Sequence, residues 1–287
     1  MIKFTKRFYW NNKWRARKIY YDFTQQLFNF KYYTQINRVR KLFNDELSKN
    51  TLDAFYQLKM HNNVNPMLNV TRPAHMQYFD ESVIKPKRKS VFVEMGALDG
   101  ATSLQFVEWT NNDYESIWCF EPDELSCNRS MVAMAHLKNV TIFQEGVSDN
   151  CGVSNFASLG TGGSHFSEES EMKVKVTTLD SKVRQYNFVP TIIKMDIEGA
   201  EKAALIGSSE TIMKHKPVLM VSAYHKICDV YELPFFIKKT YPDYRLYLRH
   251  YDFRDYFKDI SPETSETHAM HFELVLYAIP KNYANMK

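Results

Sequence analysis

The sequence has 287 residues, of which 44% are hydrophobic and 24% are charged, and its formal net charge is +4. This length accommodates one full α/β domain with a modest extension, and the composition is that of a globular protein with a sizeable core. No stretch approaches the roughly 20 apolar residues of a membrane-spanning helix, and the four cysteines lack the spacing of a zinc site or a disulfide framework.

The first 43 residues are strongly basic and aromatic. They contain eleven Lys or Arg, one acid (Asp22) and thirteen aromatic side chains, whereas the remaining residues hold 26 basic and 32 acidic side chains. Such an arm suits an anionic membrane surface, a nucleic acid backbone, or packing against the core or a second subunit. Residues 1–18 have no continuous apolar run, so we expect no secretory signal and a cytoplasmic protein, which could lie peripherally at the inner face of the membrane.

Before residue 90 the pattern is helical with breaks. Residues 14–47 and 51–60 lack Gly and Pro and are predicted to be helical, and the Lys-Pro-Lys-Arg-Lys run at 85–89 is predicted to be a linker. We therefore divide the chain into a basic, aromatic-rich helical N-terminal extension (residues 1–89) and a second domain (residues 90–287).

From residue 90 onward, short apolar runs alternate with helical stretches. Strands are predicted at 91–95, 116–120, 140–144, 191–195, 217–222, 244–248 and 272–279, and helices at 102–110, 124–137, 200–214 and 229–240. Residues 150–180 interrupt this rhythm and are predicted to form an inserted loop and edge hairpin. The pattern predicts an α/β fold with a Rossmann-like, seven-stranded, mostly parallel sheet and an antiparallel last strand.

A glycine-containing turn follows the first predicted strand. Its glycines let the backbone approach a ligand, and the helix after it presents free N–H groups. Leu98 stands where a dinucleotide fingerprint would have its second glycine, which argues against a bound pyrophosphate. The acid at the strand end favours S-adenosylmethionine, which carries an ammonium and a sulfonium but no phosphate. The predicted cofactor contacts of this turn are Glu94, Gly96, Ala97, Asp99 and Gly100.

Acidic positions also follow the next two strands. Glu121 ends the second strand, where a carboxylate can accept hydrogen bonds from both ribose hydroxyls. Ser148 and Asp149 follow the third strand and could accept a hydrogen bond from the adenine amino group. Each of these residues is also common in turns, but together they predict a nucleoside site at the carboxyl edge of the sheet.

These residues, with the Thr-Thr-Leu-Asp run at 177–180 and the run at 193–201, resemble the FkbM-type methyltransferase family. The family's lysine-x-aspartate-x-glutamate-glycine-x-glutamate run is present as Lys194, Asp196, Glu198, Gly199 and Glu201. The resemblance covers roughly residues 90–280 and implies S-adenosylmethionine-dependent O-methylation, often of sugars or other secondary products. Glu94 stands where the family usually has Asp, and Leu98 where it often has Asn, which removes one polar contact from the pocket.

Methyl transfer from a sulfonium is an in-line displacement, so the acceptor oxygen must be aligned and must lose its proton. Strand alternation places Lys194 and Asp196 on one side of their strand, near the carboxyl edge. Asp196 is predicted to contact the cofactor or the acceptor hydroxyl, or to act as the base, with Glu198 supporting it, and Lys194 is a further catalytic candidate. As helix N-terminal acids, both could instead contribute only about 1 kcal/mol of stability.

His225, after the fifth strand, is a second candidate base because an unperturbed imidazole has a pKa of about 6.5. A divalent ion could replace the base by lowering the pKa of the hydroxyl. Only Asp196 and Glu198 are close enough in sequence to bind one together, so we favour a base and predict no metal ligands.

Three classes of function fit the sequence. We favour an O-methyltransferase for a small-molecule or glycan acceptor, because a lipid-linked glycan would explain a basic arm beside a membrane. An RNA methyltransferase would use the arm to bind phosphates, but the rest of the chain is net negative and has no Asn/Asp-Pro-Pro-Tyr-like motif. The third class is a non-enzymatic nucleoside-binding module. The sequence does not specify the acceptor or the oligomeric state.

Overall fold

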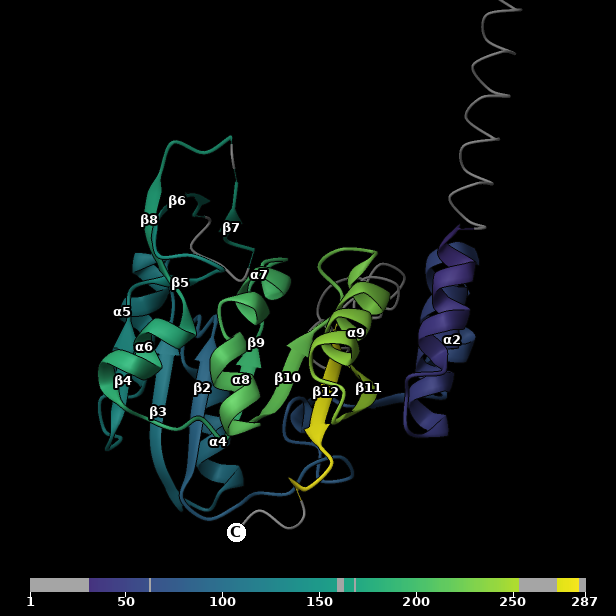
Figure 1. Cartoon of the computed structure of the whole chain (residues 1–287), viewed down its shortest axis with the longest axis horizontal. Helices are drawn as coiled ribbons and strands as arrows, with labels where there is room; N and C mark the ends of the chain where they lie inside the picture. Colours follow the sequence, from purple (N-terminus) through teal and green to yellow (C-terminus); the bar gives the residue numbers. More distant parts are fainter. Residues whose placement is uncertain (1–30, 62, 159–162, 168, 253–272, 284–287) are drawn as a thin grey trace, which may run out of the picture.

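An eight-stranded sheet forms the centre of the computed structural model, which describes residues 31–61, 63–158, 163–167, 169–252 and 273–283 (Figure 1). In spatial order the strands are β4 (Val140–Phe143), β3 (Tyr114–Phe120), β2 (Ser90–Met95), β9 (Ile192–Met195), β10 (Val218–Ser222), β12 (Leu274–Pro280), β11 (Tyr244–Asp252) and β1 (Thr71–Pro73). All neighbours are parallel except β12, which runs antiparallel to both β10 and β11.

The predicted α/β fold, with a mostly parallel sheet and an antiparallel last strand, is confirmed. The described sheet has eight strands rather than seven, because Thr71–Pro73 of the N-terminal extension adds one parallel to β11.

Helices cover both faces of the sheet, as the uninterrupted apolar strands require. The helices of the second domain are α4 (Ala101–Trp109), α5 (Glu124–Ala133), α6 (Leu179–Tyr186), α7 (Glu201–Ile206), α8 (Ser209–His215) and α9 (Asp229–Thr240). Alternate residues of β2 point to opposite faces: Val93 joins the core beneath α7, α8 and α9, whereas Phe92 stacks on Phe106 of α4 with ring centroids 4.5 Å apart. Parallel strands buried in this way hold their carboxyl ends at one edge.

The single helix predicted at 200–214 is two helices, α7 and α8, separated at Gly207 and Ser208. A Cβ at Gly207 would lie 1.9 Å from the carbonyl oxygen of Ser148. Only glycine therefore allows the junction between α7 and α8 to lie so close to the chain at Ser148. The carboxylate of Asp180 then accepts hydrogen bonds from the amides of Glu210 and Thr211, at 3.0 and 2.8 Å, and caps the start of α8.

The insertion predicted at 150–180 forms its own small sheet instead of extending an edge of the main one. The small sheet also includes β5 (Gly146–Val147), which precedes the insertion, and in spatial order its strands are β5, β8 (Lys173–Thr177), β6 (Gly152–Ala157) and β7 (His165–Phe166). In Figure 1 these strands lie beyond the ends of β2, β3 and β9. The small sheet is therefore placed over the carboxyl edge.

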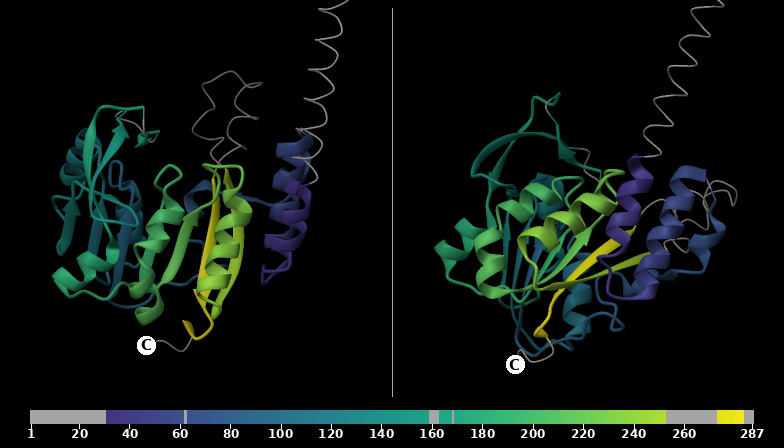
Figure 2. Two further views of the ribbon diagram at one scale, coloured as in Figure 1. Left: turned by 45° about the horizontal axis from the view of Figure 1, so that its top comes forward. Right: turned by 45° about the vertical axis from the view of Figure 1, so that its right-hand side comes forward.

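The described residues between 31 and 73 of the N-terminal extension pack on the opposite end of the main sheet from β4 (Figures 1 and 2), whereas Phe79 packs on Phe92 of β2. Residues 31–40 are helical, and α2 (Glu46–His61), α3 (Asn65–Leu68) and the 3-10 turn η1 (Ala74–Met76) follow. Tyr32, Ile36, Val39 and Phe43 are buried at helical spacing, and Phe43 forms a bridge with Leu246 of β11.

Residues 31–43 of the predicted basic arm thus pack against the core, while residues 1–30 lie outside the described residues. None of the helices in the described ranges has the length and hydropathy of a membrane-spanning helix.

Candidate active site

A pocket of about 730 Å³ opens at the carboxyl edge of the main sheet. Its walls are the loops that follow β2, β3, β9 and β10, together with Glu273 at the start of β12, while Phe156 and Phe166 of the small sheet close one side. Small-molecule sites in open α/β sheets lie at this edge, and this volume is typical of them.

The turn after β2 forms the floor of the pocket. Gly96 adopts a φ of +80°, and a Cβ there would lie 1.9 Å from the carbonyl oxygen of Asp196, so glycine lets the ends of β2 and β9 come together. Gly96, Ala97 and Asp99 line the pocket, as the sequence predicts. Gly100 does not line it; this residue adopts a φ of +83° as the N-cap of α4.

Glu94 is the first predicted contact that the structure places elsewhere. Its carboxylate is buried beneath the turn, 3.3 Å from Nζ of Lys194, and accepts a hydrogen bond from Ser103. The side chain of Glu94 points from β2 into the core. Glu94 therefore supports the floor of the pocket and does not line it.

Lys194 lines the pocket, but its ammonium group already contacts two neighbouring residues. Besides facing Glu94, its Nζ donates a hydrogen bond of 2.6 Å to the carbonyl oxygen of Gly96. Burial alone would lower the pKa of Lys194, but the charges of Glu94 and Asp196 outweigh it and raise the pKa. The ammonium therefore stays charged and fixes the turn against β9.

Glu121, at the end of β3, is held rigidly at the pocket wall. One carboxylate oxygen accepts the amide of Leu98 at 2.9 Å and the other accepts the amide of Asp123 at 3.0 Å. Burial raises the pKa of this carboxyl group. Each oxygen keeps a second lone pair, so the group can still accept two hydrogen bonds from a diol.

Ser148 and Asp149 do not line the pocket, so their predicted adenine contact is not supported. The preceding Gly146 and Val147 line it instead. The reason is local: the amide of Ser148 donates to the carbonyl oxygen of Thr177 in the small sheet, and Asp149 is turned to solvent, where it contacts Asn150.

Asp196 lies directly after β9, and both oxygens of its carboxylate accept hydrogen bonds. Its Oδ2 accepts a hydrogen bond of 2.8 Å from the phenol of Tyr78, and its Oδ1 accepts one of 3.3 Å from Tyr224. Burial would raise its pKa, but the positive charges of Lys194 and His225 outweigh this and lower it. Asp196 is therefore an anion at neutral pH.

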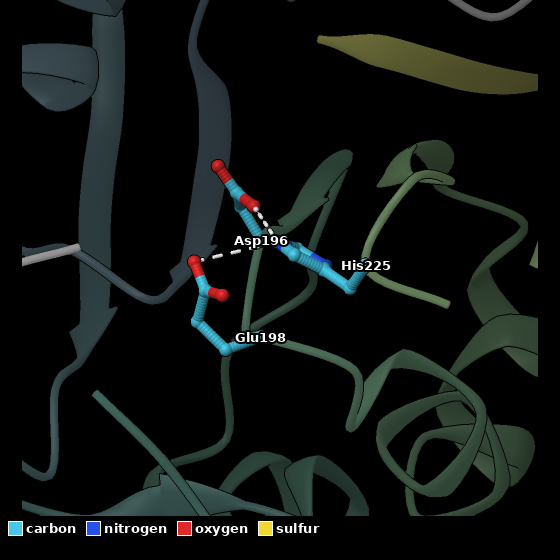
Figure 3. Close-up of side chains that lie close together, drawn as sticks. All are labelled: Asp196, Glu198 and His225. Atoms are coloured by element: carbon cyan, nitrogen blue, oxygen red, sulfur yellow. Dashed lines mark ion pairs between the residues drawn. The ribbon is translucent and has the colours of Figure 1, made fainter. Parts of the chain in front are cut away.

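Figure 3 shows the side chains of Asp196, Glu198 and His225 pointing toward one another. Nε2 of His225 lies 3.3 Å from Oδ1 of Asp196 and 3.4 Å from Oε1 of Glu198, and Nδ1 lies 2.8 Å from Oε1 of the buried Glu201. Glu198 reaches this cluster with a φ of +53°, a left-handed conformation that non-glycine residues rarely adopt.

The three carboxylates around His225 change the role that we expect for it. Burial would lower its pKa, but Glu198, Glu201 and Asp196 raise the pKa to about 11. An imidazole that already carries a proton at neutral pH cannot accept another, so the general-base role predicted for His225 is not supported in this arrangement.

Four residues that shape the site were not predicted from the sequence as site residues: Tyr224 and Glu273, which line the pocket, and Tyr78 and Glu201, which contact lining residues. Glu201 belongs to the family's run and Tyr224 precedes His225, so both could have been found there. Tyr78 has no such signal, because it lies outside the domain that carries the motifs. Burial and the charge of Asp196 raise the pKa of Glu273 to about 7, and Gln77 donates a hydrogen bond to its carboxylate.

Acidic groups dominate the pocket lining. Among the described residues, five carboxylates (Asp99, Glu121, Asp196, Glu198 and Glu273) line it against two cationic side chains, Lys194 and His225. A pocket with this balance favours a ligand that carries positive charge, and disfavours a phosphate.

Residues 94–254 match the sequence model of a family described as the methyltransferase FkbM domain, which is more than half of the chain. No curated protein matches the sequence significantly.

Solved structures with a similar fold include the methyltransferase FkbM from Methylobacillus flagellatus KT, with a TM-score of 0.70 and 23% identity. The match covers 86% of this chain but only 59% of that protein. An rRNA methylase from Streptococcus thermophilus has a TM-score of 0.43 and 12% identity, over 74% of this chain and 97% of that one. Aeropyrum pernix fibrillarin with bound S-adenosyl-L-methionine has a TM-score of 0.37 and 12% identity, over 67% of each chain.

Proposed function

Since the chain belongs to the FkbM methyltransferase family, we propose that it is an S-adenosylmethionine-dependent O-methyltransferase whose acceptor is a hydroxyl of a sugar, a glycan or another small molecule. S-adenosylmethionine is the cofactor. The observation that carries the proposal is a single pocket that contains both Glu121 and Asp196.

The cofactor lies across the ends of β3, β2 and β9 in this proposal. Glu121 accepts hydrogen bonds from the two ribose hydroxyls through the free lone pair of each oxygen. The adenine occupies the side lined by Val147, Phe156 and Phe166, where apolar surface replaces the polar contact first expected from Asp149. The positive charges of the ammonium and the sulfonium are balanced by the acidic lining.

The acceptor enters the other end of the pocket, at Asp196, Tyr224 and Glu273. In-line transfer requires the acceptor oxygen and the methyl carbon to meet at about 3 Å. Asp196 is well suited to orient the hydroxyl, because Tyr78 and Tyr224 fix its carboxylate and it is anionic at neutral pH. Sugars and similar polyols fit a pocket whose acceptor end carries several hydrogen-bond acceptors.

Binding and turnover test the two halves of the proposal separately. We expect S-adenosylhomocysteine to bind the protein in calorimetry, and methyl groups to pass from S-adenosylmethionine to hydroxyl acceptors in a panel of sugars and polyols. Asp196→Asn should bind S-adenosylhomocysteine normally but transfer poorly. A folded protein that binds no S-adenosylhomocysteine would exclude the proposal and favour a non-enzymatic module that retains only the fold.

A further inference from the structure

Beyond the contacts assigned above, three side chains converge on one point of the acceptor end. The ligand-type atoms of Asp196, Glu198 and His225 all lie within 4.8 Å of one another, and they come from the loops after two adjacent strands (Figure 3). The sequence left only Asp196 and Glu198 as neighbours; the fold adds an imidazole to them. We propose that this triad binds a divalent first-row metal cation, with Mn²⁺ as the probe that its ligand set fits.

The spacing of the three atoms suits a bound cation better than direct hydrogen bonds. The side chain of His225 is only 6% exposed, and within the described part of the chain its Nε2 makes no hydrogen bond, although two carboxylate oxygens lie 3.3 and 3.4 Å away. Ligand atoms that bind one ion at about 2.1 Å lie about 3.0 Å apart at octahedral angles and about 3.4 Å apart at tetrahedral angles. The two distances from Nε2 are therefore close to those within a coordination shell around a small cation.

Groups behind the triad hold its members in place, as the outer contacts of metal sites do. Nδ1 of His225 faces Oε1 of Glu201 at 2.8 Å, so Nε2 is the nitrogen that points at Asp196 and Glu198, and a bound cation would replace the proton that Nε2 otherwise carries. Glu201 is itself fixed by the amides of Ile197 and Gly199, at 3.0 and 3.3 Å. On the other side, Tyr78 binds Oδ2 of Asp196 and leaves Oδ1 directed at the triad.

The donor set decides the class of cation. Two carboxylate oxygens and one imidazole nitrogen suit a divalent first-row ion better than Ca²⁺ or Mg²⁺, which prefer oxygen ligands alone, and Mn²⁺ serves as the probe because it accepts carboxylate ligands. The three protein ligands also leave positions open, and all three residues line the pocket. A bound cation would therefore be accessible to a hydroxyl of the acceptor.

The role of the cation rests on the proposed function, whereas its binding does not. A metal-bound hydroxyl is more acidic and releases its proton to water. The acceptor oxygen then forms a bond to the methyl carbon, the carbon–sulfur electron pair returns to sulfur, and neutral S-adenosylhomocysteine leaves. No residue then needs to act as the base.

The test measures Mn²⁺ binding to the full-length protein by the loss of the electron paramagnetic resonance signal of free Mn²⁺, in the absence of cofactor and acceptor. We expect one Mn²⁺ per chain. Glu198→Gln, a change at a partly exposed position, should weaken binding at least tenfold, and Glu201→Gln should weaken it about 10- to 100-fold. His215→Gln, an α8 position outside the pocket lining, is the matched control and should leave binding unchanged.

Calorimetry with S-adenosylhomocysteine separates this proposal from the proposed function. Glu201→Gln, a change behind the triad and outside the pocket lining, should bind S-adenosylhomocysteine as well as the wild type does. A wild-type protein that binds S-adenosylhomocysteine but not Mn²⁺ overturns the metal site alone, and so does Mn²⁺ binding that persists in both the Glu198 and Glu201 variants. If the protein binds Mn²⁺ with the expected variant effects but does not bind S-adenosylhomocysteine, the metal site is supported and the proposed function is excluded.

Discussion

The phenol of Tyr78 donates a hydrogen bond of 2.8 Å to Oδ2 of Asp196, although the two residues are 118 positions apart in the sequence. Tyr78 belongs to the N-terminal extension and Asp196 to the family's characteristic run. The same phenol lies 3.0 Å from Oγ of Ser222 on β10. The extension therefore contributes directly to the geometry of the candidate active site and does not only extend the sheet.

Tyr78→Phe should lower kcat/KM while leaving the affinity for S-adenosylhomocysteine unchanged. The substitution keeps the ring but removes a hydrogen bond to a charged group, worth about 1.5–3 kcal/mol. If that bond orients Asp196 for transfer, the rate falls roughly tenfold to a hundredfold. Steady-state kinetics and calorimetry on the purified variant would measure the two quantities.

The matched control for this change is Tyr244→Phe. Tyr244 is also buried, and its phenol donates a 2.8 Å hydrogen bond to the carbonyl oxygen of Pro217, outside the pocket lining. Both variants should lose some stability, but only Tyr78→Phe should lose activity. Equal kcat/KM values for the two variants would show that the contact with Asp196 is structural only.

Glu121→Ala should abolish measurable binding of S-adenosylhomocysteine while the protein remains folded. The substitution removes both ribose acceptors and the contacts that fix the Leu98 and Asp123 amides at the pocket wall. Isothermal calorimetry would report the affinity and circular dichroism the fold. Glu108→Ala, at an exposed position on α4, is the control. Unchanged affinity in Glu121→Ala would show that the ribose lies elsewhere.

The sheet could be predicted from the sequence because its signals are local. Runs such as Val91-Phe92-Val93 are apolar on both faces, which is typical of a buried parallel strand, and glycine or proline marks where such runs end. The strand Thr71–Pro73 could not be predicted in this way. It has three residues, ends in proline, and exists only because β11 offers an edge for pairing.

The residues of the candidate site also divide into those with a local sequence signal and those without one. Gly96, Glu121 and Asp196 follow directly from strand ends, so their place at the pocket could be predicted. Whether an acid near a strand end points outward or inward depends on neighbouring elements: Glu94 faces Lys194 in the core, and Asp149 is directed to solvent by the small sheet. The charge state of His225 depends on three carboxylates, and those meet only in the fold.

Asp45→Asn should destabilise the packing of the N-terminal extension at neutral pH but not at low pH. The Asp45 carboxylate lies 2.6 Å from Nη2 of the buried Arg249 on β11, and also accepts the amide of Ser48 at 2.9 Å. Burial would raise the pKa of Asp45, but the hydrogen bonds from Arg249 and Ser48 outweigh it and lower the pKa. Asparagine keeps the helix-capping geometry, so the change isolates the charge.

The sign of the pH dependence follows from this shift. A carboxyl group whose pKa is lower in the folded state stabilises the protein fully above its unfolded pKa, about 3.9, and loses that contribution as the pH falls through the folded value. The melting temperature of Asp45→Asn should be roughly 5 °C below that of the wild type at pH 7, and the gap should narrow as the pH falls below about 3.9. Asp53→Asn, which breaks a solvent-exposed pair with Arg40, is the control and should change little. A gap that does not narrow as the pH falls would contradict the assignment.

Neutralising basic residues of the arm should release the protein from anionic membranes. We propose that residues 1–30, with seven Lys or Arg and one Asp, hold the enzyme beside lipid-linked acceptors at the inner face of a membrane, because residues 31–43 already pack against the core. Each basic residue near an anionic surface contributes about 1 kcal/mol. Replacing Lys13, Arg15, Arg17 and Lys18 by Gln should therefore weaken co-sedimentation with phosphatidylserine-containing vesicles at least a hundredfold.

The control is a variant with four Lys→Gln changes at exposed positions of the second domain, which should have little effect on vesicle binding: Lys138, Lys173, Lys175 and Lys214. A wild-type protein that does not bind these vesicles, but shifts RNA in a steeply salt-dependent manner, would instead support a nucleic acid acceptor.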